Sequence, residues 1–531
     1  MKTKEYVVPT NLLCDYGTDE GFFKQIEEEN KNRAEIISTT FDNCNIPVTV
    51  EDVKYGPTFT RYEISVPNCV TYKSVFAKYE DLNLWLNIRN KIRMVAPIHG
   101  SLRIGIEVPH STSATVGLKS LIESEEFKSA KQPALSFCLG CDVCGKPIVL
   151  DIVKMPNLLV GGATGTGKSV FLSSLLVSLI YKYSPEELRL ILVDPKRVEF
   201  SLFKGIPHLL TGEIFTDNAK VLFVLKWLIQ EMEERYKKCS GVLAKNINEY
   251  NSYAEKNNLE KLPNLLVVID EFTDLTYSKK EKKLFEYAIA RLLPKSRAAG
   301  IHLIMATQRI NESVESVPIK TNFTSRVAFK TVTVAESYRI MGEPGAETLV
   351  GRGDLLFRTA SMPDMERAQG AYVSTNEVLK VCNYLKENFE CNYEELTIKE
   401  EPECVIEDIP SSGSAGLCIE DVPSSGSAGL CIEDILSALN EESDLPSGKK
   451  TGLEPTQKNE ELIKQAMRIA ISTNDISIST IQRKLGVGFP KAGKILDTLI
   501  ERGYVSELID FKSRNILMTK EQFEEIFGEP L

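Results

Sequence analysis

The segment 161–169, GGATGTGKS, constrains this chain more than any other, because it lies between a strand-like run at 157–160 and a helix-like stretch that begins at Val170. Its glycines allow backbone N–H groups to turn inward around phosphates, and a helix N-terminus adds a favourable dipole. A surface loop rich in Gly and Ser seldom has Gly-x4-Gly-Lys-Ser in that setting. The segment therefore predicts a phosphate-binding loop, or P-loop.

Two side chains of this loop have specific expected roles. Lys168 is expected to reach the β- and γ-phosphates of a nucleotide, and the Ser169 hydroxyl is expected to hold Mg²⁺. The other residues expected around the phosphates are Gly162, Ala163, Thr164, Gly165, Thr166, Gly167 and Val170. ATP and Mg²⁺ are the ligands that this pattern predicts.

A second motif, LLVVIDE at 265–271, supplies the acidic half of such a site. Its β-branched residues are typical of a strand buried on both faces of a parallel sheet. Asp270 would bind Mg²⁺ through water, and Glu271 is a candidate to polarise the attacking water. Acids often follow apolar strands, so the signal is strong only because a P-loop precedes it. Together the two motifs predict ATP hydrolysis.

The composition is that of a cytoplasmic protein. The 531 residues are enough for about three domains, with 43% hydrophobic and 26% charged residues. We expect no membrane span and no signal peptide, since no apolar run is long enough. The formal charge of −11 argues against a DNA partner, but residues 400–444 carry much of it and contain no Lys or Arg. Bulk acidity therefore says little about the folded domains.

The twelve cysteines are scattered, as expected of reduced thiols in the cytosol. Cys138, Cys141 and Cys144 have a spacing that could indicate a metal site. No fourth Cys or His stands nearby to complete a zinc tetrahedron. We therefore interpret them as incidental cysteines on two short strands that flank a glycine turn.

Short apolar strands alternate with amphipathic helices between about 151 and 390, the pattern of a parallel α/β sheet covered on both faces. The P-loop, Asp194, Asp270 and Gln308 each follow one of these strands, so we expect them at one edge, where such sheets bind ligands. The predicted strands are 158–160, 188–193, 265–269 and 302–306.

Three other regions flank this sheet. Residues 1–45 predict a helical arm, and residues 46–150 predict a small α+β domain with a helix over 75–92. In the stretch 400–456, the acidic Ser/Gly-rich segment 405–417 is repeated at 418–430, which predicts a flexible linker. A docking motif for a protein partner within these repeats is the alternative.

Residues 457–531 predict three helices and a hairpin, the arrangement of a winged helix-turn-helix. Four basic residues lie on the expected turn and at the start of the third helix, where such domains meet the major groove of DNA. They are Arg483, Lys484, Lys491 and Lys494. A solvated basic face is the alternative interpretation of the same charges.

Several segments together resemble the FtsK/SpoIIIE family of DNA translocases over residues 46–390 and 457–520. They are VDPK at 193–196, GIPHLL at 205–210, EMEERY at 231–236, IDEF at 269–272 and RAAGIHLIMATQR at 297–309. The resemblance implies an alpha domain, a RecA-like motor at 151–399 and a winged-helix gamma domain. It also implies a homo-hexameric ring around double-stranded DNA that moves chromosomal or mobile-element DNA, with ATP at subunit interfaces.

For the reaction, the resemblance implies that Lys168, Ser169, Asp270 and Glu271 hold and hydrolyse ATP, while Gln308 senses the γ-phosphate. A neighbouring subunit would supply an arginine finger. Arg326 is the first candidate for it and Arg297 the second.

The chain departs from the family in two places that matter. Membrane-anchored members carry N-terminal transmembrane helices, whereas this chain begins almost at the alpha domain, so we expect a soluble motor. The family's recognition helix typically reads GYNRAAR, whereas residues 488–494 read GFPKAGK. Exchange of Arg for Lys removes bidentate readers of bases but keeps charge for phosphates. We expect only weak recognition of the family's chromosomal sequences.

Two other functions fit parts of the sequence. FtsK-like ATPases also drive conjugative transfer and protein secretion, although the C-terminal winged helix disfavours a polypeptide cargo. A winged-helix DNA-binding regulator with a vestigial motor is a different class, and the intact Lys168, Asp270 and Glu271 speak against it.

Overall fold

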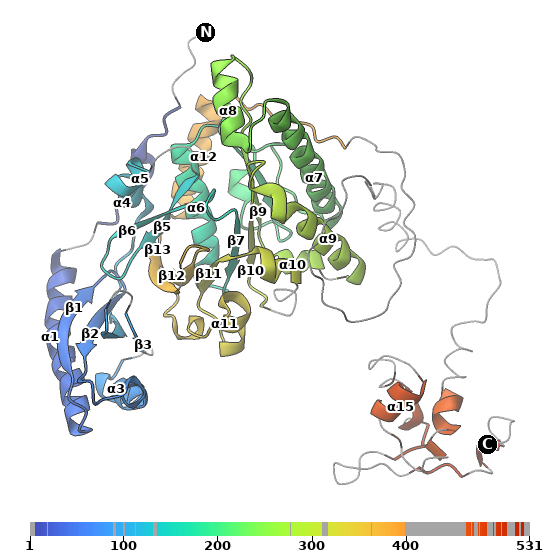
Figure 1. Cartoon of the computed structure of the whole chain (residues 1–531), viewed down its shortest axis with the longest axis horizontal. Coiled ribbons are helices and arrows are strands. Elements are labelled where there is room, and N and C mark those ends of the chain that lie inside the picture. The colour runs from blue at the N-terminus through green and yellow to red at the C-terminus, as the bar shows by residue number, and fades with distance from the viewer. Residues whose placement is uncertain are drawn as a thin grey trace. The chain divides into compact units, whose positions relative to one another are not determined.

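The computed structural model divides into two compact units, Met1–Leu439 and Asn440–Leu531 (Figure 1). The described residues are 6–17, 20–88, 92–98, 101–111, 113–130, 135–276, 278–310, 317–362, 364–398, 463–468, 470–471, 476, 478–485, 492, 495–496, 498–500, 502–506, 516–519 and 522–524. The predicted linker, 400–456, lies outside them. No described helix combines the length and the apolar character that a membrane crossing needs.

A four-stranded antiparallel sheet with the order β1-β2-β4-β3 forms the N-terminal part of the first unit (Figure 1). Its helices pack on it through a core that includes Ile37, Phe41, Tyr62 and Leu82. Two shorter helices stand where one helix was expected over 75–92, and the second is capped by Asn87, whose φ of 47° is left-handed. The elements are α1 (Glu20–Asn43), β1 (Thr49–Tyr55), β2 (Phe59–Ser65), α2 (Tyr72–Phe76), α3 (Tyr79–Leu86), β3 (Arg93–Val95) and β4 (Ile104–Pro109).

The rest of the unit is built on a nine-stranded sheet with the order β6-β5-β13-β12-β11-β7-β10-β9-β8. The strands from β11 to β8 run parallel, as predicted, and the other four run antiparallel. The sheet is therefore mixed, not parallel throughout. The strands are β5 (Ser136–Cys141), β6 (Pro147–Asp151), β7 (Asn157–Gly161), β8 (Leu188–Val193), β9 (Asn264–Ile269), β10 (Ile301–Thr307), β11 (Ser325–Phe329), β12 (Asp354–Arg358) and β13 (Glu366–Gly370).

Short connections join β5 to β6 and β12 to β13, since a tight hairpin can join antiparallel strands whereas parallel strands need a long crossover. Between β5 and β6 the turn is closed by hydrogen bonds from Asp142 N to Lys146 O and from Gly145 N to Asp142 O. Cys138 and Cys141 are buried on β5, so the predicted pair of strands around a glycine turn is confirmed. The large sheet thus reaches back to residue 136, into the stretch 46–150.

Helices cover both faces of the large sheet, as the strand pattern predicts. Along β9, Leu266 and Val268 join a core with α6 and α12, whereas Val267 and Ile269 join a core with α7 and α9. The helices are α4 (Leu118–Ile122), α5 (Glu125–Lys128), α6 (Lys168–Lys182), α7 (Asn218–Gly241), α8 (Ile247–Lys256), α9 (Lys279–Ser296), α10 (Val317–Asn322), α11 (Val334–Met341) and α12 (Thr375–Asn388), with short 3-10 turns η1 (Thr10–Leu12), η2 (Ser201–Phe203), η3 (Phe272–Thr276) and η5 (Ala346–Thr348). A capping box formed by Ser374 and Glu377 begins α12.

The N-terminal segment 6–16 lies along α6 and α12, a placement that the sequence did not indicate. The Tyr6 hydroxyl donates to Ile180 O at 2.7 Å, and Glu377 on α12 accepts from Cys14 N at 2.7 Å and from the Tyr16 hydroxyl at 2.8 Å. This segment therefore ties the start of the chain to the large sheet.

The C-terminal unit has a hydrophobic core of its own, which includes Met467, Ile481, Leu499 and Phe523. Helical residues occur at 463–468 and 470–471, in α15 (Ile478–Leu485), and at 492, 495–496 and 498–500. Val505 and Ile516 form an antiparallel bridge. These residues lie in the region where three helices and a hairpin were predicted, and residues 522–524 are helical in addition.

Candidate nucleotide-binding site

The predicted P-loop joins β7 to the N-terminus of α6 and is held by the neighbouring strands. Gly162 N donates to Thr307 O at the end of β10, and Ala163 N donates to Lys330 O just after β11. The Thr166 hydroxyl closes the loop on Ala163 O at 2.6 Å. Val170 lies in the first turn of α6. The loop is therefore shaped without a ligand, because its outer hydrogen bonds come from the sheet.

Two glycines give the loop the geometry that phosphates need. Gly165 and Gly167 have φ values of 77° and 121°, which other residues rarely adopt. A Cβ on Gly165 would point into open space, whereas one on Gly167 would lie 2.7 Å from Gly353 N. Within the described part of the chain, no acceptor bonds the N–H of Gly165 or Gly167. Unpaired N–H groups at a helix N-terminus form a cradle for an anion.

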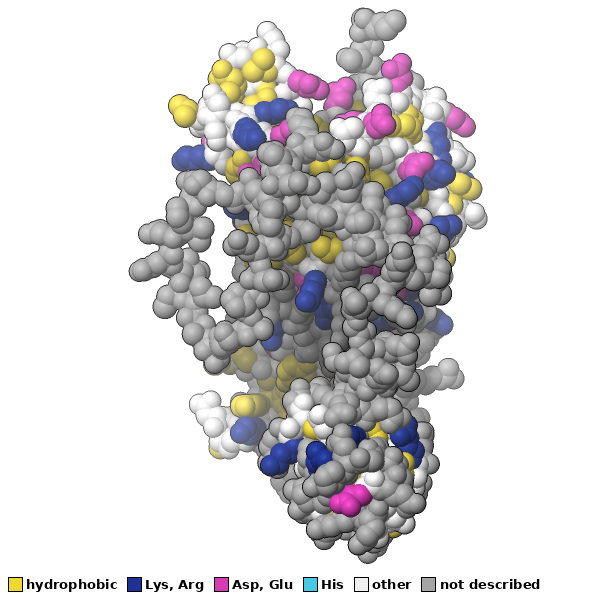
Figure 2. All heavy atoms as spheres, turned by 90° about the vertical axis from the view of Figure 1, so that its right-hand side faces the viewer, with side chains coloured by type: hydrophobic (Ala, Val, Ile, Leu, Met, Phe, Trp, Pro, Cys, Tyr) yellow, Lys and Arg dark blue, Asp and Glu magenta, His cyan; other side chains and the backbone are white. Residues whose placement is uncertain are grey.

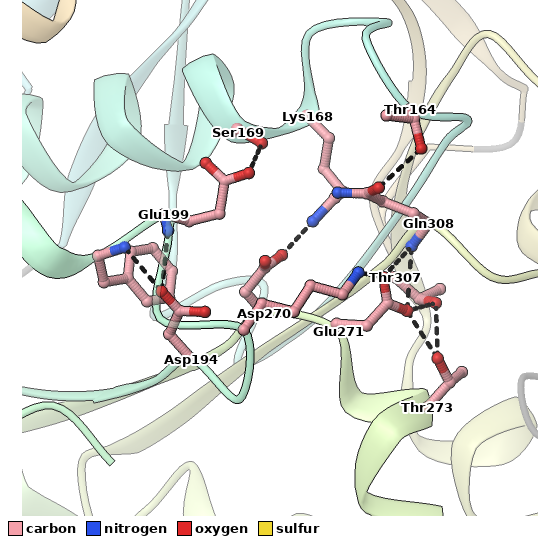
Figure 3. Close-up of polar contacts among 12 residues, drawn as sticks. Thr164, Lys168, Ser169, Asp194, Glu199, Asp270, Glu271, Thr273, Thr307 and Gln308 are labelled. Carbon is pink, nitrogen blue, oxygen red and sulfur yellow. Dashed lines mark hydrogen bonds and ion pairs between the residues drawn. The ribbon is translucent and has the colours of Figure 1, made fainter. Parts of the chain in front are cut away.

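Lys168 and Asp270 form a buried ion pair at the centre of the site (Figure 3). Lys168 is 2% exposed, at the start of α6, and Asp270 is fully buried directly after β9. Asp270 Oδ2, the other carboxylate oxygen, has no hydrogen-bond partner among the described residues. Ser169 supplies a hydroxyl next to Lys168. A hydroxyl and an unpaired carboxylate oxygen are the hard donors that Mg²⁺ prefers, so the residues fit the predicted ion.

Two further acids lie at this edge: Asp194, which was expected here, and Glu199, which was not and which contacts Ser169. Glu199 Oε1 accepts from the Ser169 hydroxyl at 2.5 Å, and Asp194 Oδ2 accepts from Glu199 N at 2.8 Å and from Phe200 N at 3.1 Å. Asp194 follows β8 at the same edge of the sheet (Figure 3). The edge is thus more acidic than the two adjacent carboxylates at 270–271 suggested. Glu199 carried no sequence signal, because it lies in a loop outside any motif.

Glu271 is fully buried, and its backbone is in the left-handed region with a φ of 57°. Lys196 Nζ lies 2.8 Å from Glu271 Oε2, and the hydroxyls of Thr273 and Thr307 donate to Oε1 at 2.6 and 2.7 Å. Gln308 N donates to Oε2 at 3.1 Å. Burial alone would raise the pKa of Glu271, but these donors outweigh it and lower the pKa to about 2. Its carboxylate is therefore ionised and fixed in one orientation.

Gln308 connects this carboxylate to the P-loop. Its side-chain oxygen accepts from the Thr164 hydroxyl at 2.8 Å, while its backbone N–H contacts Glu271 (Figure 3). The structure thus brings together Lys168, Asp270, Glu271 and Gln308, as expected of residues that follow neighbouring parallel strands.

Arg326 lies on β11, and its guanidinium donates hydrogen bonds to backbone carbonyls of its own chain. Arg326 donates to Phe323 O at 2.9 Å, to Ile340 O at 2.7 Å and to Lys320 O at 3.2 Å. These bonds favour a structural role. Arg297, the second candidate for an arginine finger, is exposed at the end of α9.

Part of the predicted DNA-binding set can be placed in the C-terminal unit. Arg483 and Lys484 lie on α15, and Lys484 is exposed, whereas Lys491 and Lys494 lie outside the described residues. Figure 2 shows Lys and Arg side chains at several points on the visible face of this unit. The exposed basic residues described there are Arg468, Lys484 and Arg502.

Family models match three parts of the chain: the FtsK/SpoIIIE family at residues 117–312, the FtsK alpha domain at 9–110 and the FtsK gamma domain at 457–519. The first two matches meet between residues 110 and 117, ahead of β5, which agrees with the place of β5 and β6 in the large sheet.

Relatives match over almost the whole chain. The DNA translocase FtsK of Caldanaerobacter subterraneus subsp. tengcongensis is 35% identical over 494 residues, covering 93% of this chain and 62% of that protein. The DNA translocase FtsK of Haemophilus influenzae is 33% identical over 536 residues, covering 97% of this chain and 92% of that protein. This chain therefore spans less than two thirds of the first relative and nearly all of the second.

Among solved structures, the pCW3 conjugation coupling protein TcpA with ATPγS matches at a TM-score of 0.46 and 22% identity, over 67% of this chain and 99% of that one. The assignment of the family rests on the sequence matches, above all on the near full-length match to the Haemophilus influenzae protein. The chain belongs to the FtsK/SpoIIIE family.

Proposed function

We propose that this protein is an ATP-driven double-stranded DNA translocase, acting as a homo-hexameric ring in the cytoplasm during chromosome segregation or the transfer of mobile elements. The observation that carries the proposal is the meeting of Lys168 with Asp270 and Glu271 at one edge of the sheet. Membership of the family and the match to the gamma domain support DNA as the substrate.

The residues that would hold the nucleotide are those of the P-loop. The unpaired N–H groups of Gly165 and Gly167 would bind phosphate oxygens, and Lys168 would exchange its ion pair with Asp270 for the β- and γ-phosphates. Ser169 and Asp270 would hold Mg²⁺, directly or through water. When bound, Mg²⁺ supplies positive charge that neutralises the phosphates.

Glu271 would orient the attacking water through its ionised carboxylate. Its low pKa makes orientation and electrostatic polarisation its main contribution, since a strongly acidic carboxyl accepts a proton poorly. Gln308 would sense the γ-phosphate, because it touches both the P-loop and Glu271. Of the two arginines proposed as fingers, Arg297 is the better placed to reach a neighbouring subunit, since Arg326 is bonded to three carbonyls of its own.

The RecA-like motor would pull DNA, and the C-terminal winged helix would contact it through Arg483, Lys484, Lys491 and Lys494. A protein partner at the repeats within 400–456 or at the gamma domain is part of the same proposal. The rival functions are a conjugative or secretion ATPase and a DNA-binding regulator.

One assay separates these functions. ATP hydrolysis by the purified chain is measured alone, with linear duplex DNA and with single-stranded DNA, and displacement of a DNA triplex reports translocation. We expect stimulation by duplex DNA and triplex displacement that depends on ATP. Turnover without any response to duplex DNA would favour a polypeptide cargo, and absence of turnover would favour the regulator. Lys168→Ala controls for contaminating ATPases, with Lys256→Ala on α8 as the matched exposed lysine.

A further inference from the structure

The loop Val350–Asp354, which leads into β12, packs directly against the P-loop. Gly353 N donates to Thr166 O at 2.8 Å, and a Cβ on Gly167 would lie 2.9 Å from Gly353 Cα. Gly167 directly precedes the first turn of α6. This part of a P-loop typically surrounds the α- and β-phosphates of a nucleotide. In a bound nucleotide, the α- and β-phosphates would therefore be the neighbours of this loop, whereas the γ-phosphate would lie toward Gln308.

Arg352 occupies the tip of this loop with an unusual backbone. Its φ is 54°, between Gly351 at 93° and Gly353 at 91°. Left-handed backbone is uncommon for a residue with a side chain, and such strain persists where the surroundings over-determine it, often at ligand clamps. Here Gln369 Nε2 donates to Arg352 O at 2.9 Å, and Val350 N donates to Asp354 Oδ2 at 2.7 Å.

The guanidinium of Arg352 has no anionic partner within the described part of the chain. The side chain is exposed, and the nearest acid along the chain, Asp354, is occupied by Arg367 on both of its oxygens. Lys330 adds a second cation nearby, since a Cβ on Gly351 would lie 3.9 Å from Lys330 Cδ. A cation held in a strained loop beside a phosphate cradle, with no acid to neutralise it, is poised for an anion.

We propose that Arg352 is part of the nucleotide site and pairs with the α- or β-phosphate of the bound nucleotide. This inference rests on the proposed function, because it needs the P-loop to bind a nucleotide. This role differs from the roles proposed for Gln308 and for an arginine finger, which would act on the γ-phosphate. Arg352 therefore strengthens the binding of ATP and ADP alike, whereas groups that touch the γ-phosphate favour ATP.

The test is calorimetric titration of the full-length chain with Mg²⁺-ADP and with Mg²⁺-ATPγS. Arg352→Ala and Arg352→Gly remove the side chain, Arg352→Lys keeps a point charge, and Lys256→Ala is the control for an exposed cation far along the chain. We expect Kd to rise about tenfold to a hundredfold for both nucleotides in the Ala and Gly variants, as for one lost charge-assisted hydrogen bond, with a smaller rise for Lys.

A comparison of Arg352→Ala with Arg352→Gly excludes a folding defect as the cause of a higher Kd. Glycine tolerates a φ of 54° better than alanine, so Arg352→Gly is expected to unfold at or above the temperature of the unmodified chain without nucleotide. Unchanged Kd values in both variants, while Lys168→Ala abolishes binding, would overturn the role of Arg352 and leave the proposed function intact. A rise for ATPγS alone would also overturn it. Failure of the unmodified chain to bind either nucleotide would overturn both proposals.

Discussion

Arg367 Nη1 lies 2.8 Å from Glu107 Oε2, and this ion pair joins the two sheets of the first unit. Glu107 is on β4 of the small sheet and also pairs with Arg61 and Arg93, whereas Arg367 is on β13 of the large sheet and also pairs with Asp354. Burial alone would raise the pKa of Glu107, but the three arginines lower it to about 2. The junction is thus a network of ion pairs in the interior of the molecule.

Arg367→Ala is expected to lower the free energy of unfolding by about 3 kcal/mol or more, because it leaves Glu107 and Asp354 buried with too little positive charge. Lys261→Ala, which removes an exposed pair with Glu255, is the control and should change it by less than about 0.5 kcal/mol. Each substitution is measured by chemical denaturation followed through a single tryptophan. One background retains only Trp85 on α3, and the other retains only Trp227 on α7. Equal effects of the two substitutions would contradict the prediction.

His302 is a buried histidine on β10 whose two ring nitrogens have no hydrogen-bond partner among the described residues. Burial, together with the charges of Arg235 and Arg297, lowers its pKa to about 3. The unfolded chain takes up a proton below a pH of about 6.5 while the folded chain stays neutral, so His302 destabilises the fold increasingly as pH falls from 6.5 toward 3.

His302→Leu is therefore expected to increase stability more at pH 5 than at pH 7.5, by up to about 2 kcal/mol. Denaturation at the two pH values measures the difference. Met305→Leu, on the same strand, has no titrating group and should shift stability equally at both values. An equal shift for His302→Leu would mean that His302 has the same pKa in the folded and the unfolded chain, and would contradict the prediction.

Lys168→Ala and Glu271→Gln are expected to fail at different steps. Loss of Lys168 removes the charge that meets the phosphates, so nucleotide binding should be abolished or weakened by more than about tenfold. Glu271→Gln keeps the P-loop and should bind ATP and assemble as the unmodified chain does, yet hydrolyse it at least about a hundredfold more slowly.

Titration with a nucleotide, steady-state hydrolysis and light scattering measure these three properties. Glu255→Gln, an exposed acid on α8, is the matched control for Glu271→Gln. Substantial hydrolysis by both site variants would refute the assignment of the site.

Arg326→Ala is expected to lower the free energy of unfolding by about 2 kcal/mol, since three backbone carbonyls lose their donor. Arg297→Ala should leave stability unchanged, because Arg297 is exposed.

If Arg297 acts as the finger, mixing its Ala variant with Lys168→Ala subunits should recover part of the ATPase activity, since some interfaces regain a complete site. Recovery with Arg326→Ala instead would reverse the assignment.

The C-terminal unit can be tested alone because it has a core of its own. Duplex binding by residues 457–531 should weaken steeply with salt, and Lys484→Ala or Lys491→Ala should reduce the slope of log K against log salt by about 1.

Preference for a guanine-rich octamer over a scrambled duplex should stay below about tenfold, because lysine lacks the bidentate fork of arginine. Competition binding measures it, and a hundredfold preference would contradict the prediction.

The local sequence determined the elements of the motor and the chemistry at their ends. Apolar periodicity is a local property, so β7, β8, β9 and β10 were predicted within a residue or two of their observed bounds. The P-loop and the acids after β9 were predictable because each motif combines side chains with a strand or helix of defined type. That all of them lie at one edge followed from the rule that ligands gather at the carboxyl ends of parallel strands.

Only the tertiary structure decided which distant residues meet. Glu199 reaches Ser169, Lys196 and two threonines hold Glu271, and Arg352 lies beside the P-loop through loops whose paths have no periodic signal. The same holds for β5, β6, β12 and β13, which join the parallel strands across long stretches of chain. The physical reason is that side-chain chemistry is local, whereas the partner that neutralises a buried charge is chosen by the packing of the whole sheet.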